Sequence, residues 1–259
     1  MKIVLQKFIA ESGYCSRRKA EELIRQSIGT HNYASPKGAH KNAPVVLVNG
    51  ELPELGMKVD EKDEVKIFGK IISLPKNKIY LKLNKPVGYV CTNKSFKEEK
   101  SVFELLPVDF RGLIIAGRLD KDSRGLLFLT NDGGLVARLT HPRYEHEKEY
   151  IAEIFNNRPG LPTGKFSAEG IAKAFKTGID IGEGDGVVKA KQIKALGDNR
   201  FQIILTEGKK RQIRRMFRAL GLEVKDLARV RIGNLVLGDL KEGEWRELTR
   251  EEIVKISKS

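Results

Sequence analysis

The strongest constraint on the fold is a charged loop set between two apolar runs near the middle of the chain. The runs are residues 113–116 and 126–129, and the loop between them holds five charged side chains, among them Arg118 and Asp120. Apolar runs on both sides of a polar turn predict two buried strands. A charged loop held by rigid strands suits a reaction site, but an ordinary hairpin loop has the same spacing. The spacing alone leaves both interpretations open.

A surplus of positive charge narrows the classes of partner. The 259 residues include 48 lysines and arginines against 34 acidic residues, a net charge of +14. Such an excess favours an anionic partner, most simply nucleic acid, although a basic enzyme of small substrates is also compatible with it. Cys15 and Cys91 are too few for a disulfide scaffold or a cysteine zinc site, so we expect a reducing, cytoplasmic location and no metal. No run approaches the ~18 apolar residues of a membrane helix, so we expect no membrane partner.

The first 70 residues predict a small domain made of two helices and a sheet. Apolar residues at helical spacing predict a helix before Gly13 and a second helix that begins after Ser16, a favourable N-cap. Residues 45–50 and 65–68 predict strands. The candidate contacts to an RNA backbone lie at the start and on the polar face of the second helix, although a solvated helix face is the alternative: Ser16, Arg17, Arg18, Lys19 and Arg25.

A polar stretch that contains Pro75 separates this region from the rest of the chain. We expect a linker over residues 71–78 and a second domain over residues 79–259. Residues 1–75 carry 12 basic and 9 acidic side chains, so most of the positive charge belongs to the second domain.

Residues 206–231 hold the densest positive charge, with nine basic and three acidic side chains. Ile213, Met216 and Phe217 recur at helical spacing and should face the core, which places Arg214 between an apolar and a basic face. A solvated helix usually mixes charges of both signs, so we interpret the run as a track for an RNA backbone. The candidate contacts are Lys209, Lys210, Arg211, Arg215, Arg218 and Arg229.

Three blocks of sequence resemble, in the same order, the RNA pseudouridine synthases that modify a uridine of ribosomal RNA, the RsuA/RluB/RluE/RluF group. They are residues 117–127 (G-R-L-D-K-D-S-R-G-L-L), 146–150 (H-E-K-E-Y) and 207–216 (E-G-K-K-R-Q-I-R-R-M). The resemblance implies an α+β protein: a small S4-like RNA-binding domain over residues 1–70, then a catalytic domain on a mixed, mainly antiparallel sheet flanked by helices. Residues 28–44 depart from the pattern as a polar insertion.

The resemblance also implies the chemistry. Isomerising uridine to pseudouridine needs a carboxylate near the sugar and the base and no cofactor, which agrees with the absence of a Ser-His-Asp arrangement or a phosphate-cradling loop. A carboxylate in a closed pocket needs a cation beside it to stay ionised. The implied roles are Asp120 as the catalytic carboxylate, Arg214 as its cationic partner, Tyr150 stacked on the target base, Arg118 filling the space of the flipped uridine, and Ile213 and Leu227 as the apolar wall.

Details of the blocks are closest to the RluF branch, which implies large-subunit (23S) ribosomal RNA as the partner, free or in a pre-ribosomal particle, and a monomeric enzyme. The competing hypothesis is a non-catalytic RNA-binding factor of ribosome assembly. Asp120 argues against it, because a binder gains nothing from an acid that repels phosphate inside a basic groove. A DNA-binding regulator is weaker still, since the sequence shows no pattern of a recognition-helix dimer.

Overall fold

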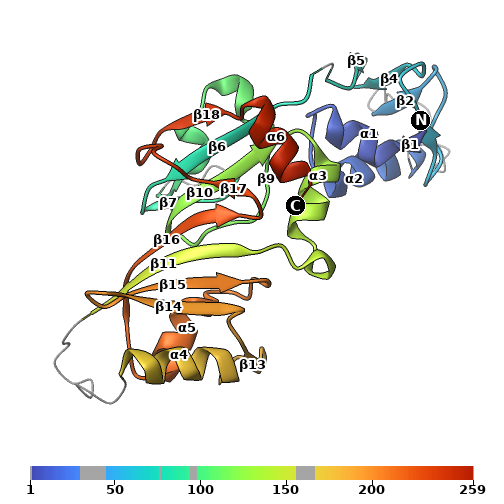
Figure 1. The fold of residues 1–259 in the computed structure, drawn as a ribbon. Helices are drawn as coiled ribbons and strands as arrows, with labels where there is room; N and C mark the ends of the chain where they lie inside the picture. Colours follow the sequence, from blue (N-terminus) through green and yellow to red (C-terminus); the bar gives the residue numbers. More distant parts are fainter. Residues whose placement is uncertain (1, 30–44, 76, 94–97, 156–166, 259) are drawn as a thin grey trace. The chain divides into compact units, whose positions relative to one another are not determined.

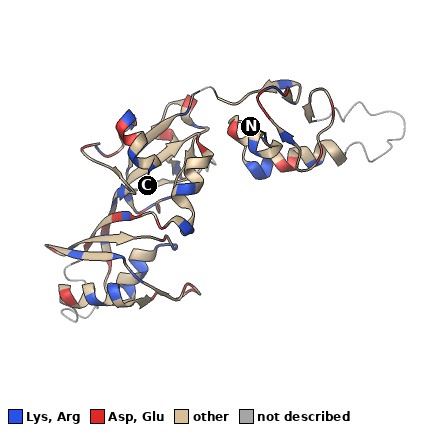
Figure 2. Cartoon of the chain, turned by 45° about the vertical axis from the view of Figure 1, so that its right-hand side comes forward, with Lys and Arg blue, Asp and Glu red and all other residues tan. Residues whose placement is uncertain are grey.

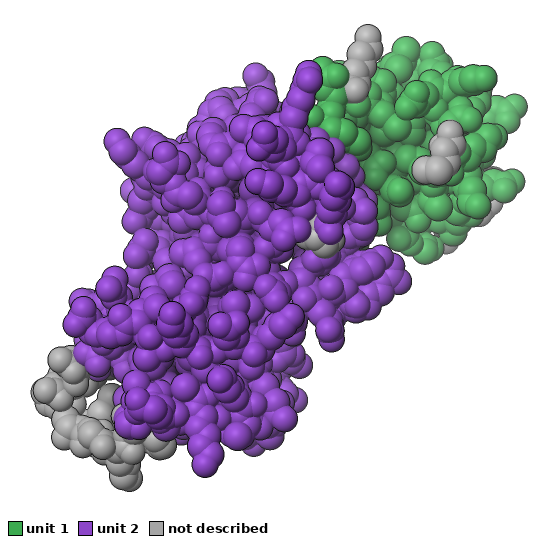
Figure 3. Space-filling model, in the orientation of Figure 1, with its two compact units in different colours: residues 1–78 green, residues 79–259 purple. Residues whose placement is uncertain are grey.

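The chain divides into two compact units. The structure is a computed structural model that describes residues 2–29, 45–75, 77–93, 98–155 and 167–258 (Figure 1). The units are residues 1–78 and 79–259 (Figure 3), and each has its own buried core. The insertion expected over residues 28–44 falls almost wholly outside the described residues. Within the described part of the chain, no helix combines the length and the apolar character needed to cross a membrane.

The first unit packs two helices against small strands. Ser16 caps the second helix, because its Oγ accepts a hydrogen bond from the backbone N–H of Lys19 at 3.3 Å. Ile72 pairs with Val65, so the sheet continues into the segment that the sequence suggested as a linker. The elements are β1 (Ile3–Val4), α1 (Leu5–Glu11), α2 (Arg17–Gly29), β2 (Val46–Val48), β3 (Lys58–Val59), β4 (Val65–Ile67) and β5 (Lys70–Ile72).

The second unit is built on one large sheet, with strand order β14-β15-β11-β16-β10-β6-β18 and with β17 and β9 pairing β16 and β10. Every pair in it is antiparallel except β10 with β16, which confirms the predicted mixed, mainly antiparallel sheet. Its strands are β6 (Tyr80–Lys85), β9 (Ile114–Ile115), β10 (Arg124–Thr130), β11 (Lys148–Ile154), β14 (Gln192–Gly197), β15 (Arg200–Leu205), β16 (Val224–Ile232), β17 (Leu235–Val236) and β18 (Trp245–Glu247).

Helices cover both faces of this sheet. Residues of β10 alternate between two cores: Leu127 and Leu129 belong to one, and Leu126 and Phe128 to the other. The first core includes apolar residues of α4 (Ala168–Thr177) and α5 (Gln212–Ala219), and the second those of α3 (Gly133–Thr140) and α6 (Arg250–Ser257). The short elements are η1 (Val102–Leu105), η2 (Val108–Phe110), η3 (Pro142–Tyr144), and the pairs β7 (Tyr89–Val90) with β8 (Lys100–Ser101) and β12 (Ile179–Asp180) with β13 (Val187–Val188).

The parallel contact between β10 and β16 is unusually close. Gly125 lies opposite Arg229 with φ of 105°, and a Cβ atom at this position would lie 2.3 Å from the backbone oxygen of Arg229. Only glycine fits here. The contact fixes the end of the charged loop, residues 117–123, against the middle of β16.

Candidate active site

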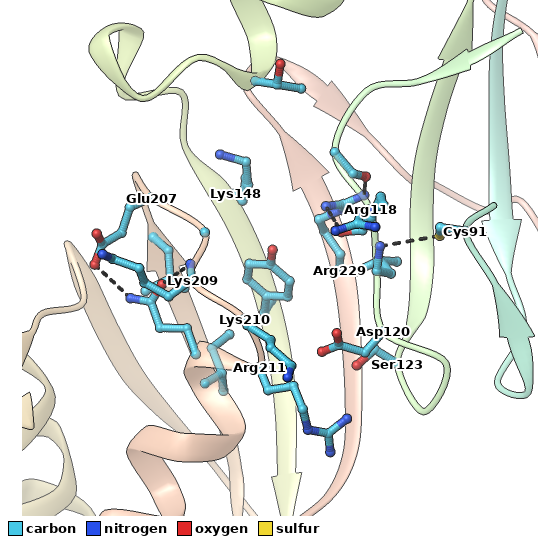
Figure 4. Close-up of a pocket in the computed structure, with 18 of the residues that line it drawn as sticks. Cys91, Arg118, Asp120, Ser123, Lys148, Glu207, Lys209, Lys210, Arg211 and Arg229 are labelled. Carbon is cyan, nitrogen blue, oxygen red and sulfur yellow. Dashed lines mark hydrogen bonds between the residues drawn. The ribbon is translucent and has the colours of Figure 1, made fainter. Parts of the chain in front are cut away.

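A cleft of about 630 Å³ opens in the second unit beside the charged loop (Figure 4). Its lining comes from this loop, the region of β11, the segment 205–213 and β16. The structure thus brings together residues that lie far apart in the sequence. Of the predicted catalytic and substrate-binding residues, all but Arg214 line the cleft: Arg118, Asp120, Tyr150, Ile213 and Leu227. Across the residues that the structure describes, no group of three or more His, Cys, Asp or Glu side chains could hold a metal ion.

Two buried cations hold the loop through its backbone oxygens. The Arg229 guanidinium donates to the carbonyls of Gly117 at 2.8 Å and of Leu126 at 2.9 Å. On the other side of the loop, the Lys85 ammonium donates to the carbonyls of Ser123 at 2.5 Å and of Pro86. Charge-assisted bonds of this kind fix a backbone more firmly than neutral ones. The loop that carries Asp120 is therefore rigid.

Arg214 is a third cation against this loop, and its partner corrects the expectation from sequence. It donates to the backbone oxygen of Asp122 at 2.7 Å and to that of Val224 at 3.0 Å, and its Nε lies 3.4 Å from the Asp122 carboxylate. Arg211 also binds that carboxylate through two hydrogen bonds, of 2.6 and 2.9 Å. Within the described part of the chain, the direct ion pair of Arg214 is therefore with Asp122, while Asp120 acts on Arg214 only through its charge.

The electrostatics of the loop follow from these contacts. Burial pushes the pKa of Asp122 upward, but hydrogen bonds from Arg211 and the charge of Arg214 outweigh it, and the pKa lies below its usual value. Burial lowers the pKa values of Lys85 and Arg214, and nearby anions, Asp120 among them, oppose this effect. Asp120 is thus within electrostatic range of several cations, and its carboxylate extends into the cleft from the loop (Figure 4).

Tyr150 reaches the cleft from β11, between β15 and β16. It pairs with Ile203 on one side and with Arg229 on the other, and it is 9% exposed. Lys148, two residues earlier on the same strand face, also lines the cleft. Burial and then the charge of Arg229 lower its pKa. Lys148 was not predicted as a site residue, although the alternation of strand residues places it on the face of Tyr150.

The predicted basic track is only partly exposed. Lys209 and Lys210 are exposed and line the cleft (Figure 4), and Arg218 is exposed on α5. Arg211 also lines the cleft, although the bonds to Asp122 occupy its guanidinium.

Arg215 and Arg229 were wrongly assigned to that track. Arg215 is 7% exposed, and its guanidinium binds the carbonyl of Ile181 and the carboxylate of Asp185, so it holds the turn at residues 182–186. Arg229 is 1% exposed and is occupied by the loop carbonyls described above. A guanidinium buried and bonded in this way is not available to a phosphate.

The basic residues of α2 belong to the first unit and are exposed. Lys19 pairs with Glu22 at 2.9 Å and Arg25 with Glu21 at 2.8 Å, so cationic and acidic side chains share the solvent face of this helix (Figure 2). The other predicted contacts, Arg17 and Arg18, are also exposed.

Comparison with known proteins identifies the fold and the family. Residues 79–219 match the family model of RNA pseudouridylate synthase. An uncharacterized RNA pseudouridine synthase of Aquifex aeolicus is 35% identical over 98% of this chain and 96% of its own length, and the dual-specificity RNA pseudouridine synthase RluF of Escherichia coli K12 is 35% identical over 98% and 78%. A crystal structure of a pseudouridylate synthase superposes with a TM-score of 0.65 at 32% identity, covering 98% of this chain and 99% of the other. The chain therefore belongs to the RNA pseudouridine synthases, isomerases of the RsuA/RluF type.

Proposed function

We propose that this enzyme isomerises a uridine of large-subunit ribosomal RNA and that Asp120 is its catalytic carboxylate. One observation carries the assignment. Three acidic residues line the cleft, and two of them are occupied: Glu99 pairs with Lys121 at 3.3 Å, and Glu207 accepts a hydrogen bond from Gln212 at 2.9 Å. Asp120 is the one of the three whose carboxylate has neither an ion pair nor a side-chain hydrogen bond to any other described residue.

The reaction needs an anion at this point. The bond between C1′ of the ribose and N1 of uracil breaks, the base turns, and C5 of the same base forms a new bond to C1′. C5 loses its proton in this exchange, and N1 gains one. A carboxylate can begin this sequence by attacking the sugar or the base, or by removing a ribose proton, and in every case it must be ionised. The cations Lys85, Arg211 and Arg214 lie within electrostatic range of Asp120.

Other residues that line the cleft are suited to bind different parts of the RNA. Tyr150 offers its ring to the target base, and Ile213 and Leu227 form an apolar wall. A uridine inside folded RNA must leave the stack to reach Asp120, and Arg118 at the edge of the cleft is suited to fill the space it leaves. Lys209 and Lys210 at the mouth of the cleft are suited to the RNA backbone.

The first unit acts as an S4-like RNA-binding domain in this proposal, and the enzyme acts as a monomer. Two helices followed by a small sheet, with exposed basic residues on α2, support a second grip on the RNA. The likeness to RluF supports large-subunit ribosomal RNA as the substrate. Mapping pseudouridines in ribosomal RNA from cells with and without the gene identifies the modified position.

The test of the catalytic assignment is Asp120→Asn. We expect turnover on unmodified ribosomal RNA transcript to fall more than about 1,000-fold, roughly 4 kcal/mol of barrier, while RNA affinity stays equal or rises because a repulsion is removed. Asp109→Asn is the matched control, since Asp109 is exposed outside the cleft and should keep full turnover. If Asp120→Asn retains turnover within about tenfold, another group carries the reaction.

A further inference from the structure

A group of aromatic and basic side chains forms the outer edge of the cleft beyond α3. Residues 141–146 follow this helix, and three of them, His141, Pro142 and His146, line the cleft. None of these side chains has a role in the proposed reaction. We refer to residues 141–146 as the rim.

The rim is organised around Tyr144, whose side chain is 40% exposed. Its ring lies 6.2 Å from that of His141 in an edge-on arrangement and 5.9 Å from that of His146 in a tilted one. The Arg143 guanidinium stacks over the tyrosine ring, 4.5 Å from its centroid, and also bonds the hydroxyl. Tyr144 is therefore held from several sides and still offers part of its ring to solvent.

Local bonds keep this arrangement in place. His141 caps the short helix η3, because its Nδ1 accepts a hydrogen bond from the backbone N–H of Arg143 at 3.2 Å. Glu145 ends η3 in the left-handed conformation, with φ of 49°. Burial, followed by the charge of Lys148, lowers the pKa of His146. A rigid aromatic platform loses little conformational entropy when a ligand stacks on it.

We propose that the rim is a second nucleotide subsite, in which a base that flanks the target uridine stacks on the Tyr144–Arg143 pair. RNA bases that leave a helix are recognised by stacking on aromatic rings and on guanidinium planes, and this pair offers both. The site lies next to His141 and His146 at the wall of the cleft that would take the target, so an adjoining nucleotide is within its reach. The inference rests on the proposed RNA substrate but not on the identity of the catalytic residue.

The test measures binding separately from chemistry. In full-length protein carrying Asp120→Asn, we compare Tyr144→Ala, Tyr144→Phe and Phe155→Ala for affinity to an unmodified transcript of large-subunit ribosomal RNA. Phe155 is the matched control, because it is a 43% exposed aromatic residue of the same unit outside the cleft lining. We expect Tyr144→Ala to weaken binding by about 5- to 100-fold, the range of one base stack, and the other two variants to stay within about twofold.

A second measurement locates the base. The RNA segment that the protein protects is made as synthetic hairpins, each lacking one base, and each is bound to the proteins with and without Tyr144→Ala. We expect one abasic hairpin to bind both proteins equally, since the stack is already absent. The subsite is overturned if Tyr144→Ala binds within twofold of its parent, if Tyr144→Phe loses as much, or if no missing base removes the difference. Failure of the parent to bind the transcript at all would overturn the proposed substrate together with the subsite.

Discussion

The lysines and arginines of helix α2 and those around the loop that carries Asp120 have opposite surroundings. On α2, Lys19 and Arg25 are exposed and pair with glutamates one turn away. Around the loop, Lys85 and Arg229 are at most 1% exposed, and they donate hydrogen bonds to backbone carbonyls. Exposed pairs within a helix contribute only about 0.3–0.5 kcal/mol, whereas a buried charge costs several kcal/mol unless its bonds are made.

The difference separates cations that build a site from cations that are available to a ligand. The side chains of Arg229 and Lys85 are committed to the carbonyls of the loop, while those on α2 remain free to exchange a glutamate for a phosphate. A count of charges along the sequence gives both groups the same weight. Each of the following predictions tests this division.

The largest effect is expected at Arg229. Arg229→Met leaves the carbonyls of Gly117 and Leu126 without their donor, and we expect the free energy of unfolding to fall by about 3 kcal/mol and turnover to be abolished. Urea unfolding measures the first effect. Arg218→Met, at an exposed position of α5, should change stability by less than about 0.5 kcal/mol. Equal decreases of stability in the two variants would remove the distinction.

Arg214 should affect turnover more than binding. It anchors the loop from the side of α5, so Arg214→Met should lower turnover by about 100-fold, roughly 2.7 kcal/mol, while RNA affinity changes by only a few-fold. Arg218→Met should show the opposite pattern, with weaker and less salt-dependent binding and unchanged turnover at saturation. If both variants lose turnover and RNA affinity in the same proportion, Arg214 does not differ from an exposed RNA-binding arginine.

Lys82 is a buried lysine that, unlike Lys85, has a carboxylate as its partner. We therefore expect the stability that this pair contributes to depend on pH in the acid range. The Lys82 ammonium lies 3.0 Å from the Glu252 carboxylate. Hydrogen bonds from Arg246 lower the pKa of Glu252 from 4.5 to about 2; burial opposes this shift, and Lys82 adds to it. Its folded-state pKa is depressed, so its contribution to stability is fully present above pH 4.5 and disappears as the pH falls toward 2. We expect Glu252→Gln to cost about 2 kcal/mol at pH 7 and progressively less in acid.

Unfolding midpoints of the two proteins, measured from pH 7 down to about pH 2.5, check this prediction. Curves that remain parallel over this range would show that Glu252 does not carry the acid response.

The smallest effect is expected on α2. Replacing Arg18 and Arg25 together by alanine should leave stability within about 0.5 kcal/mol, because both side chains are exposed. RNA affinity should fall several-fold, and the slope of its logarithm against that of salt concentration should decrease by about one for each phosphate that these arginines neutralise. An unchanged slope in filter-binding titrations would exclude this face of α2 from RNA binding.

Most of the fold could be predicted because local patterns determine it. The buried alternation of β11 and the apolar stripe of α5 both follow from spacing, and the structure has them as expected. The wrong predictions concern side chains whose burial depends on a segment far away in the sequence. Arg215 lies opposite the apolar stripe of α5, but the turn at residues 182–186 covers it. No pattern around Arg215 reports that interaction.

Arg229 could have been placed better from sequence. It lies two residues after Leu227 on β16, so the two share a strand face, and Leu227 was already assigned to the pocket wall. The partner of Arg214 could not be deduced in this way. Asp120 and Asp122 lie in one loop, and a hydrogen bond from the Ser123 amide to the Asp120 carbonyl shows that the backbone turns between them. Backbone geometry of this kind is not visible in residue types.

The position of β16 in the sheet has a consequence for how the chain folds while it is being synthesised. This strand lies between β10 and β11, although it is made long after both, and it brings Arg229 to the loop that carries Asp120. A nascent chain that ends before residue 224 has both neighbouring strands and the aspartate but lacks the arginine that supports the loop. The strands on the two sides of β16 can join into one sheet only after this late segment of the chain has emerged, which makes the insertion of β16 a late step in folding. Until β16 has been made, the loop that carries Asp120 therefore lacks the hydrogen bonds that Arg229 donates to Gly117 and Leu126.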